Sequence, residues 1–318
     1  MLGRNLVNPC RRPVPPGLAP GPDDGPQGGM TGTVLSLGHG YCAAALAARL
    51  RPQGWRIVGT TRAPERAARL EASGVEPRVW PGNDLAPDLV TATHILASAP
   101  PGPDGDPFVP LLEAADAAPL WVGYLSTTGV YGDHGGGWVD EDTPPAPATE
   151  RGRRRQAAEA AWQALCTARG WPLHVFRLAG IYGPGRGPFE RLRAGTARAI
   201  VKPGQVFSRI HVADIAQVLA ASMAAPRASA VYNVCDDAPA PPQDVLAHAA
   251  RLLDLPPPPE VPFEAAELSD MARSFYAESK RVRNDRMRGE LGIELIYPTY
   301  REGLAALLAA EGDPPQGR

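Results

Sequence analysis

Apolar positions follow two alternating patterns from about residue 33 onwards. Short apolar runs predict strands at 33–38, 55–62, 75–80, 93–100 and 120–132, and a further strand that begins within 171–183. Between them, helical spacing predicts helices at 41–50, 64–74 and 151–169. A succession of strand, helix and strand is typical of a parallel sheet covered by helices on both faces. The chain is therefore predicted to have an α/β fold with a doubly wound parallel sheet.

The two ends of the chain depart from this rhythm. Residues 1–29 contain seven prolines and six glycines without a periodic apolar pattern, so we expect residues 1–30 to form a disordered extension. After residue 183 the alternation loosens into proline-rich segments and short helices. We therefore divide the chain into a nucleotide-binding domain over 31–183 and a smaller lobe, mainly substrate-binding, over 184–318. Some elements of this second part are expected to return to the first domain.

A glycine fingerprint follows the first predicted strand directly. Its residues are Gly38, His39, Gly40, Tyr41, Cys42 and Ala43, which form a GxGxxA pattern. The first glycine permits a tight turn, the second lets a pyrophosphate approach the backbone, and the alanine allows close helix–strand packing. The alternative is a chance pair of glycines in a turn. Because the pattern lies between a strand and a helix, it indicates a Rossmann-type dinucleotide site, in which His39 is a loop residue rather than a metal ligand.

The end of the second predicted strand bears on the choice of cofactor. An NAD site typically places an acidic residue there to bond the ribose 2′-hydroxyl, whereas this chain has Thr60, Thr61 and Arg62. A cation beside hydroxyls suits a 2′-phosphate. The sequence therefore favours NADP(H), with NAD as the alternative. Arg62 facing solvent without a ligand is the other interpretation.

Composition restricts the class of partner. The formal net charge of -2 provides no global field to attract nucleic acid or an anionic membrane. The four cysteines form no CxxC pair, and no apolar run approaches the roughly 18 residues that a membrane span needs. We therefore expect a cytoplasmic protein with a small-molecule substrate, without a metal site, nucleic acid or membrane as partner. The arginine run at 151–155 is interpreted mainly as a solvated helix face.

Four further motifs carry a resemblance to a known family. They are STTGVYG at 126–132, IYGPGR at 181–186, RIHVADIA at 209–216 and VYNVCDD at 231–237. With these motifs, residues 33–308 resemble the extended short-chain dehydrogenase/reductases, the branch related to nucleotide-sugar epimerases and dehydratases. The resemblance implies an NAD(P) cofactor and an oxidoreductase or epimerase activity on a small polar or nucleotide-sugar-like substrate. It also leaves room for a homodimer.

The resemblance implies specific site residues. It places Thr127 at the position of the catalytic serine or threonine, where a hydroxyl can hydrogen-bond a substrate carbonyl or alcohol without ionising. The alternative is a strand-end threonine that bonds to the backbone. The resemblance also places Ser98, Ala99 and Pro100 against the nicotinamide ribose.

The same resemblance shows a departure at the start of the long helix. Alignment on Glu159 places the catalytic tyrosine of the family at Arg151 and its lysine at Arg155. An arginine cannot replace the tyrosine as acid or base, because its guanidinium stays protonated up to about pH 12. Arg155 could still bond the ribose, and Arg151 is assigned to an anionic substrate group. The usual acid/base pair is therefore absent.

Other residues are candidates for the missing chemistry. Tyr131 follows Thr127 by four positions, and His134 and Glu141 lie in the glycine-rich loop beyond it. Arg209 is assigned to the substrate, because related sugar-nucleotide enzymes use an arginine nearby to hold a diphosphate. We expect His211 and Asp214 to fix a strand-to-helix turn.

Two functions from different classes remain open on the sequence. The first is an NAD(P)-dependent oxidoreductase or epimerase, favoured by Thr127 and by the presence of a whole second lobe. The second is a non-catalytic protein that binds NADP(H) as a sensor or carrier, favoured by the missing tyrosine and lysine.

Overall fold

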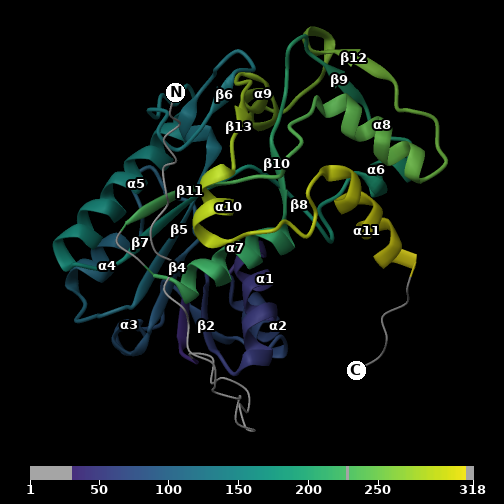
Figure 1. Cartoon of the computed structure of the whole chain (residues 1–318). Coiled ribbons are helices and arrows are strands. Elements are labelled where there is room, and N and C mark those ends of the chain that lie inside the picture. The colour runs from purple at the N-terminus through teal and green to yellow at the C-terminus, as the bar shows by residue number, and fades with distance from the viewer. Residues whose placement is uncertain (1–30, 227–228, 313–318) are drawn as a thin grey trace, which may run out of the picture.

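A seven-stranded parallel sheet forms the centre of the protein (Figure 1). The computed structural model describes residues 31–226 and 229–312, so the extension predicted to be disordered lies outside the described residues. The strand order is β11-β7-β5-β4-β1-β2-β3, and every neighbouring pair is parallel. The strands are β1 (Thr33–Leu37), β2 (Arg56–Thr61), β3 (Glu76–Val79), β4 (His94–Ala97), β5 (Trp121–Thr127), β7 (Leu173–Leu178) and β11 (Ala230–Val234). The predicted Rossmann-type fold is confirmed.

Helices cover both faces of this sheet. On one face lie α1 (Tyr41–Leu50), α2 (Ala67–Ala72), α7 (Val212–Ala224) and α10 (Asp285–Leu291). On the other lie α3 (Ala86–Thr91), α4 (Val109–Ala114) and α5 (Glu150–Arg169). Short 3-10 helices occur at η1 (Arg51–Gln53), η2 (Pro64–Arg66), η3 (Thr128–Tyr131) and η4 (Phe263–Ala265).

Alternate residues of each strand supply the two halves of the core. In β1, Val34 packs toward α1 and α7, whereas Leu35 packs toward the face that α5 covers. In β5, Trp121 likewise packs on the α1 and α7 side, and Val122 packs on the α5 side. Because successive side chains of a strand point to opposite faces, apolar runs of this kind bury both surfaces of the sheet. The burial explains why these strands read as continuous apolar segments.

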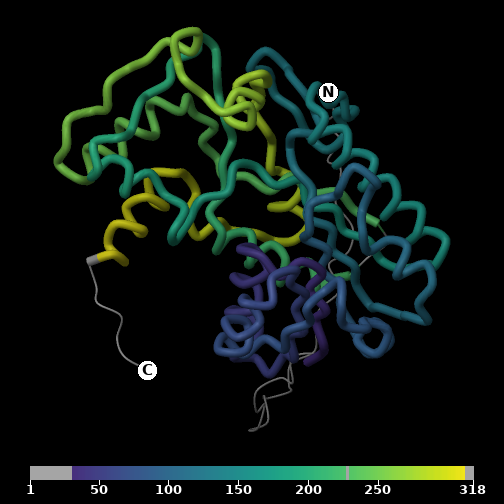
Figure 2. Tube along the Cα trace, turned by 180° about the vertical axis from the view of Figure 1, so that it is seen from behind, coloured from purple at the N-terminus to yellow at the C-terminus, as the bar shows by residue number. Residues whose placement is uncertain are grey.

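The C-terminal lobe is built from short elements beside the sheet. Figure 2 shows it from behind, at the upper left, with α11 running below it. Its parallel strand pairs are β10 with β8, β12 with β9, and β13 with β6. These strands are β6 (Trp138–Val139), β8 (Gly180–Tyr182), β9 (Ala199–Val201), β10 (Arg209–His211), β12 (Glu260–Pro262) and β13 (Arg281–Val282). The remaining helices are α6 (Phe189–Arg193), α8 (Pro242–Leu252), α9 (Asp270–Tyr276) and α11 (Tyr300–Gly312).

Two predicted strands are shorter in the structure than in the sequence pattern. The segment 171–183 breaks at Ala179, because the chain changes partners there: Ala179 N–H bonds to Val234, and Gly180 N–H bonds to Ser208 in the lobe. The segment 120–132 ends as a strand at Thr127 and continues as η3. Apolar character continues through both breaks, so the pattern alone does not show them.

The helix predicted at 64–74 begins as η2 and continues as α2. Pro64 is the first residue of η2, where a proline lacks only an N–H that would be unpaired anyway.

Candidate functional site

A cavity of about 710 Å³ lies at the carboxyl edge of the sheet, between the sheet and the C-terminal lobe. The glycine loop, the ends of β4 and β5, and the first turn of α5 line one side. Residues of the lobe line the other. Parallel sheets place their ligands at this edge, where strand order reverses, and here the reversal falls between β1 and β4. The position of the cavity is therefore that of a Rossmann-fold ligand site.

The glycine loop has the geometry that a dinucleotide site requires. Gly38 has a φ of +83°, and a Cβ built on it would come 2.8 Å from the backbone nitrogen of Ala99. Gly40 is the N-cap of α1, and a Cβ there would meet nothing closer than 3.9 Å. Ser98 lines the cavity and its hydroxyl donates to the carbonyl of Gly38. The loop, which connects β1 to α1, thus packs against the segment that follows β4, and the space around Gly40 is open.

His39 packs into the wall of this loop. A Cβ on Gly59 of β2 would come 2.9 Å from its ring, and neither ring nitrogen has a hydrogen-bond partner within the described residues. Burial lowers the pKa of His39 to about 4, so the ring is neutral at physiological pH. Cys42 is also buried, and burial raises the pKa of its thiol to about 11. Both side chains behave as packing groups.

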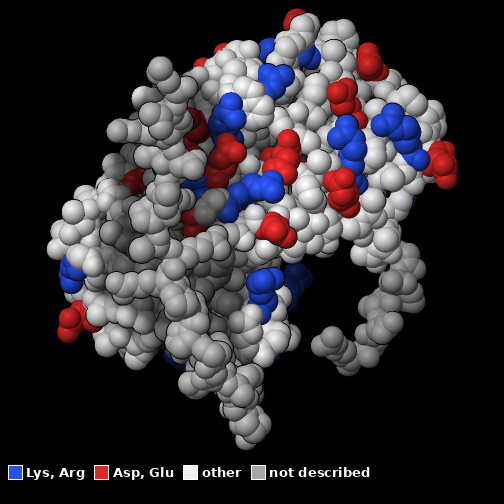
Figure 3. All heavy atoms as spheres, in the orientation of Figure 1, with Lys and Arg blue, Asp and Glu red and all other residues white. Residues whose placement is uncertain are grey.

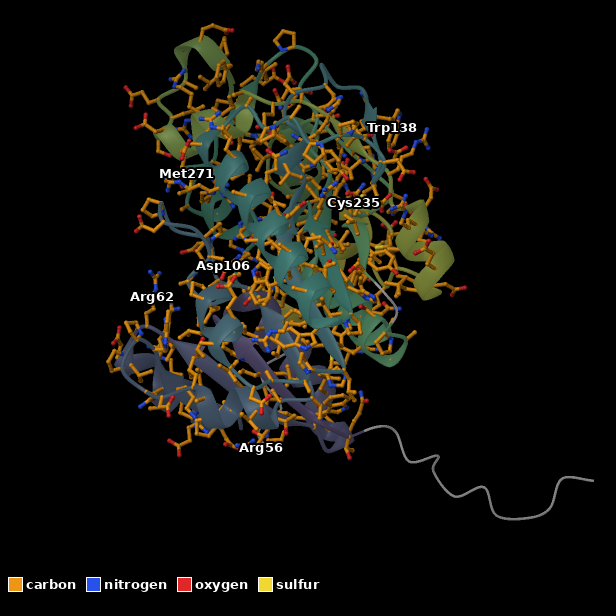
Figure 4. The ribbon with its side chains drawn as sticks, turned by 90° about the vertical axis from the view of Figure 1, so that its left-hand side faces the viewer. Arg56, Arg62, Asp106, Trp138, Cys235 and Met271 are labelled. Carbon is orange, nitrogen blue, oxygen red and sulfur yellow. The ribbon has the colours of Figure 1, made fainter. Side chains whose placement is uncertain are left out.

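The three residues at the end of β2 have different surroundings. Thr60 accepts a hydrogen bond from Gly38 N–H at 2.6 Å, and Thr61 bonds to the backbone of Ala63. Arg62 is exposed and, in the described part of the chain, has no hydrogen-bond or ion-pair partner. Figure 4 shows it projecting from the protein on the same side as Met271 of the lobe. Of the three side chains, only Arg62 is therefore open to a 2′-phosphate.

Thr127 lies where β5 ends and its side chain lines the cavity. Its hydroxyl oxygen caps η3 by accepting a hydrogen bond from Gly129 N–H at 3.1 Å. A hydroxyl that accepts one bond retains its own proton for donation. Thr127 therefore bonds to the backbone, as a structural strand-end threonine would. Its hydroxyl proton nevertheless stays free to bond a ligand in the cavity.

Arg155 is fixed to the sheet below the cavity. One guanidinium nitrogen donates to the carbonyl of Leu125 at 2.6 Å and to the hydroxyl of Tyr124 at 3.2 Å. The guanidinium also lies 5.8 Å from the Tyr124 ring centroid. Because one nitrogen has both bonds, the other donors of the fork are left for the cavity that Arg155 lines.

Tyr131 is separate from the cavity. The ring is fully buried, the hydroxyl donates to Asn233 at 2.8 Å, and it accepts from Arg177 at 3.0 Å. Burial raises the pKa of Tyr131. Glu141 accepts from the Asn233 backbone, and the His134 ring lies against the Tyr131 carbonyl. None of these three sequence candidates for proton transfer is among the described residues that line the cavity.

Arg209 lines the lobe side of the cavity. One of its nitrogens donates to the carbonyls of Phe207 at 2.9 Å and Ala240 at 3.1 Å, which holds the guanidinium in place. His211 accepts the Ala213 N–H as the cap of α7, and Asp214 accepts backbone N–H groups near residue 296. His211 therefore fixes the strand-to-helix turn, as expected, whereas Asp214 instead holds the segment at Ile296 and Tyr297 against the start of α7.

The structure adds cavity residues that the sequence did not indicate. Arg186 stacks on the Tyr41 ring at 4.2 Å, and the Tyr41 hydroxyl donates to the Pro184 carbonyl at 2.9 Å. Lys280 donates to Glu278 at 2.7 Å and to the carbonyl of residue 132 at 2.6 Å. Arg186 is the last residue of the IYGPGR motif, so this motif could have indicated from the sequence that Arg186 lies at the site. The other two residues have no local signal, since only the return of the chain after α9 brings them to the cavity.

Charges on the outer surface are mixed. Figure 3 shows acidic and basic side chains interspersed on the face that it draws. Across residues 31–226 and 229–312, no helix is long and apolar enough to cross a membrane. Over the same residues, no group of three or more His, Cys, Asp or Glu side chains is placed to hold a metal ion.

Comparisons with known proteins agree with this geometry. Residues 108–235 match the family described as "NAD dependent epimerase/dehydratase family". The chain is 32% identical over 286 residues to protein YeeZ of Escherichia coli K12, an alignment that covers 83% of this chain and 96% of that protein.

Solved structures extend the comparison. A conserved protein of unknown function from Silicibacter pomeroyi DSS is 59% identical, with a TM-score of 0.83 over 89% of this chain and 100% of that one. Human epimerase family protein SDR39U1, solved with NADPH, has a TM-score of 0.68 and 19% identity, with coverage of 88% and 99%. The second likeness concerns the fold alone.

Proposed function

The chain belongs to the NAD-dependent epimerase/dehydratase family, and on that premise we propose that it is an NADP(H)-dependent oxidoreductase or epimerase. Its substrate is a small polar or nucleotide-sugar-like compound with a carbonyl or alcohol. One observation carries this proposal: the Thr127 hydroxyl, the glycine loop and residues of the second lobe line the same cavity. A protein that only stored a dinucleotide would not need a second, substrate-sized wall facing that hydroxyl.

The residues present fit a dinucleotide cofactor. The N–H groups at the start of α1 and the open space above Gly40 suit a pyrophosphate, and Arg186 lies beside them on the cavity wall. We assign Ser98 and Arg155 to the ribose and nicotinamide end, because both line the cavity. When bound, the nicotinamide supplies or accepts a hydride.

The chain's own residues then act by binding and orientation. Thr127 donates its hydroxyl proton as a hydrogen bond to the reacting oxygen of the substrate, while its oxygen stays bonded to Gly129. Arg209, held by two carbonyls, provides a fixed cation on the lobe side. Arg155 keeps the end of β5 and the first turn of α5 together. The lobe wall restricts water around the reacting atoms.

Cofactor selectivity provides a first prediction. Wild-type protein should bind NADPH more tightly than NADH, because Arg62 alone at the end of β2 is open to a 2′-phosphate. Arg62→Ala should narrow the difference by about 1–2 kcal/mol, since an exposed charge-assisted contact lies at the low end of its usual range. Calorimetric titration of both proteins with both cofactors measures this difference. Equal affinities of the wild-type protein for NADPH and NADH would contradict it.

A second candidate function is a non-catalytic sensor or carrier of NADP(H). The arginines at positions 151 and 155 favour it, because neither can serve as the acid or base of the reaction. A crystal structure with NADPH distinguishes the two functions. The enzyme requires nicotinamide C4 to face the open cavity beside Thr127, whereas C4 enclosed by protein would favour the sensor. NADPH oxidation with a panel of sugar nucleotides and small carbonyl compounds then tests turnover directly.

A further inference from the structure

The first turns of α5 carry four arginines, and three of them have polar partners. Arg153 and Arg154 both form ion pairs with Glu150, at 3.2 and 3.0 Å. Arg155 donates to the carbonyl of Leu125. These three side chains therefore have a structural explanation inside the protein.

Arg151 is the exception. Its guanidinium lies 5.5 Å from the ring centroid of Phe275 in α9, and both side chains line the cavity. In the described residues, Arg151 makes no hydrogen bond or ion pair through its side chain. Arg155 follows one turn later on the same face of the helix. Two cations at this spacing repel each other, and a helix amino terminus disfavours cations.

Arg151 is exposed on the rim of the cavity, and no ion pair or hydrogen bond within the described residues offsets this repulsion. Partial burial of the guanidinium and, second, the charge of Arg155 lower the pKa of Arg151. Among the described residues that line the cavity, Glu278 is the only carboxylate, and it is already paired with Lys280 at 2.7 Å. An arginine that lies at a helix amino terminus beside a second cation, with no ion pair or hydrogen bond inside the protein, is typical of a functional position.

Arg151 lines the same cavity as the proposed catalytic hydroxyl, and the backbone beside it lies against η3. The backbone of α5 packs directly on η3 here, because a Cβ on Gly152 would come 2.9 Å from the carbonyl oxygen of Gly129. Gly129 in turn bonds to the Thr127 hydroxyl. A group bound by Arg151 and a group oriented by Thr127 would therefore share this cavity.

We propose that Arg151 binds a carboxylate or phosphate group of the substrate, with Phe275 covering the contact. This inference rests on the proposed function and narrows it. The substrate is a carbonyl compound or alcohol whose acidic group lies near its reacting carbon. The guanidinium fork suits either oxyanion, since it can form two parallel hydrogen bonds to a carboxylate or a phosphate.

The test uses two small anions on protein saturated with NADP⁺, so that the pyrophosphate position is already filled. Oxalate is the carboxylate probe and inorganic phosphate is the phosphate probe, each titrated by calorimetry. We expect one of them to bind, and Arg151→Gln to weaken that binding at least tenfold. Arg151→Lys keeps the charge without the fork and should give an intermediate affinity.

Arg153→Gln is the matched control. It removes a neighbouring arginine that is paired with Glu150, and it should leave probe affinity unchanged. The melting temperature adds a readout that needs no ligand. Because Arg151→Gln removes the repulsion with Arg155 and loses only an exposed contact with the Phe275 ring, its Tm should equal or exceed that of the wild-type protein, whereas an arginine with a structural role would lower it.

The outcomes separate this inference from the function on which it rests. Failure of the wild-type protein to bind any nicotinamide dinucleotide would contradict the proposed function. Dinucleotide binding combined with no affinity for either probe would overturn the inference alone. So would probe affinity that is the same in the wild-type and Arg151→Gln proteins. Preference for oxalate identifies a carboxylate substrate, and preference for phosphate identifies a phosphorylated one.

Discussion

Thr127→Val is expected to lower the kcat of NADPH-dependent turnover by about 10²-fold, the scale of a lost positioned donor at a reacting oxygen. Valine has nearly the shape of threonine but no hydroxyl, so the change removes the proposed bond to the substrate. It also removes the bond from Gly129 N–H that caps η3. The measurement is steady-state kinetics followed at the nicotinamide absorbance.

Thr127→Ser is the matched control, because it keeps the hydroxyl and loses only a methyl group. Its kcat should stay within about tenfold of the wild-type value, and the η3 cap should remain. Affinity for NADPH should change little in both variants, because Thr127 is assigned to the substrate. Full activity of Thr127→Val would remove Thr127 from the catalytic residues.

Gly38→Ala is expected to reduce both stability and cofactor binding. The φ of +83° at this position disfavours a residue with a Cβ, and the added atom would lie 2.8 Å from the nitrogen of Ala99. Backbone strain of this kind costs about 1–3 kcal/mol, and the clash adds to it. The backbone must shift to relieve this clash, and such a shift would open the turn of the glycine loop. NADPH binding should therefore fall by at least about 10²-fold. Thermal unfolding and calorimetry measure the two effects.

Gly40→Ala separates these two effects. The φ of Gly40 is -105°, and a Cβ there would meet no protein atom closer than 3.9 Å, so the melting temperature should change little. The Cβ would instead occupy the space where the pyrophosphate approaches the backbone, so NADPH affinity should still fall. Wild-type affinity in Gly40→Ala would show that the cofactor does not approach this loop.

Much of the fold could be predicted because its signals are local. The helix at 41–50 has the predicted bounds in the structure, and β1, β2, β4 and β5 lie within their predicted segments. Strand breaks were missed where partners change, as at Ala179, since hydrogen bonding to Ser208 depends on residues almost thirty positions away. The short helices α3 and α4 had too few turns to produce a helical period.

The candidate site was predictable in part. The glycine loop and Thr127 could be proposed from the sequence because their motifs follow strands directly, and in the structure both line one cavity. Tyr131 was wrongly expected to face the same cavity, because a strand was assumed to continue where η3 begins. In η3 the chain turns, and the Tyr131 hydroxyl points to Asn233 behind the wall. Glu278 and Lys280 come from a distant segment, so no local pattern could place them.

The sequence by itself determined the parallel α/β architecture, the position of the dinucleotide loop and the absence of a tyrosine and lysine from the start of α5. These properties depend on the order of apolar runs and on the identity of residues at fixed offsets. Only the tertiary structure decided which of the neighbouring arginines have polar partners and which one, Arg151, lines the cavity with no polar partner among the described residues. That distinction depends on the packing of α5 against η3, β5 and α9, and segments that meet from opposite halves of the chain leave no periodic trace in the sequence.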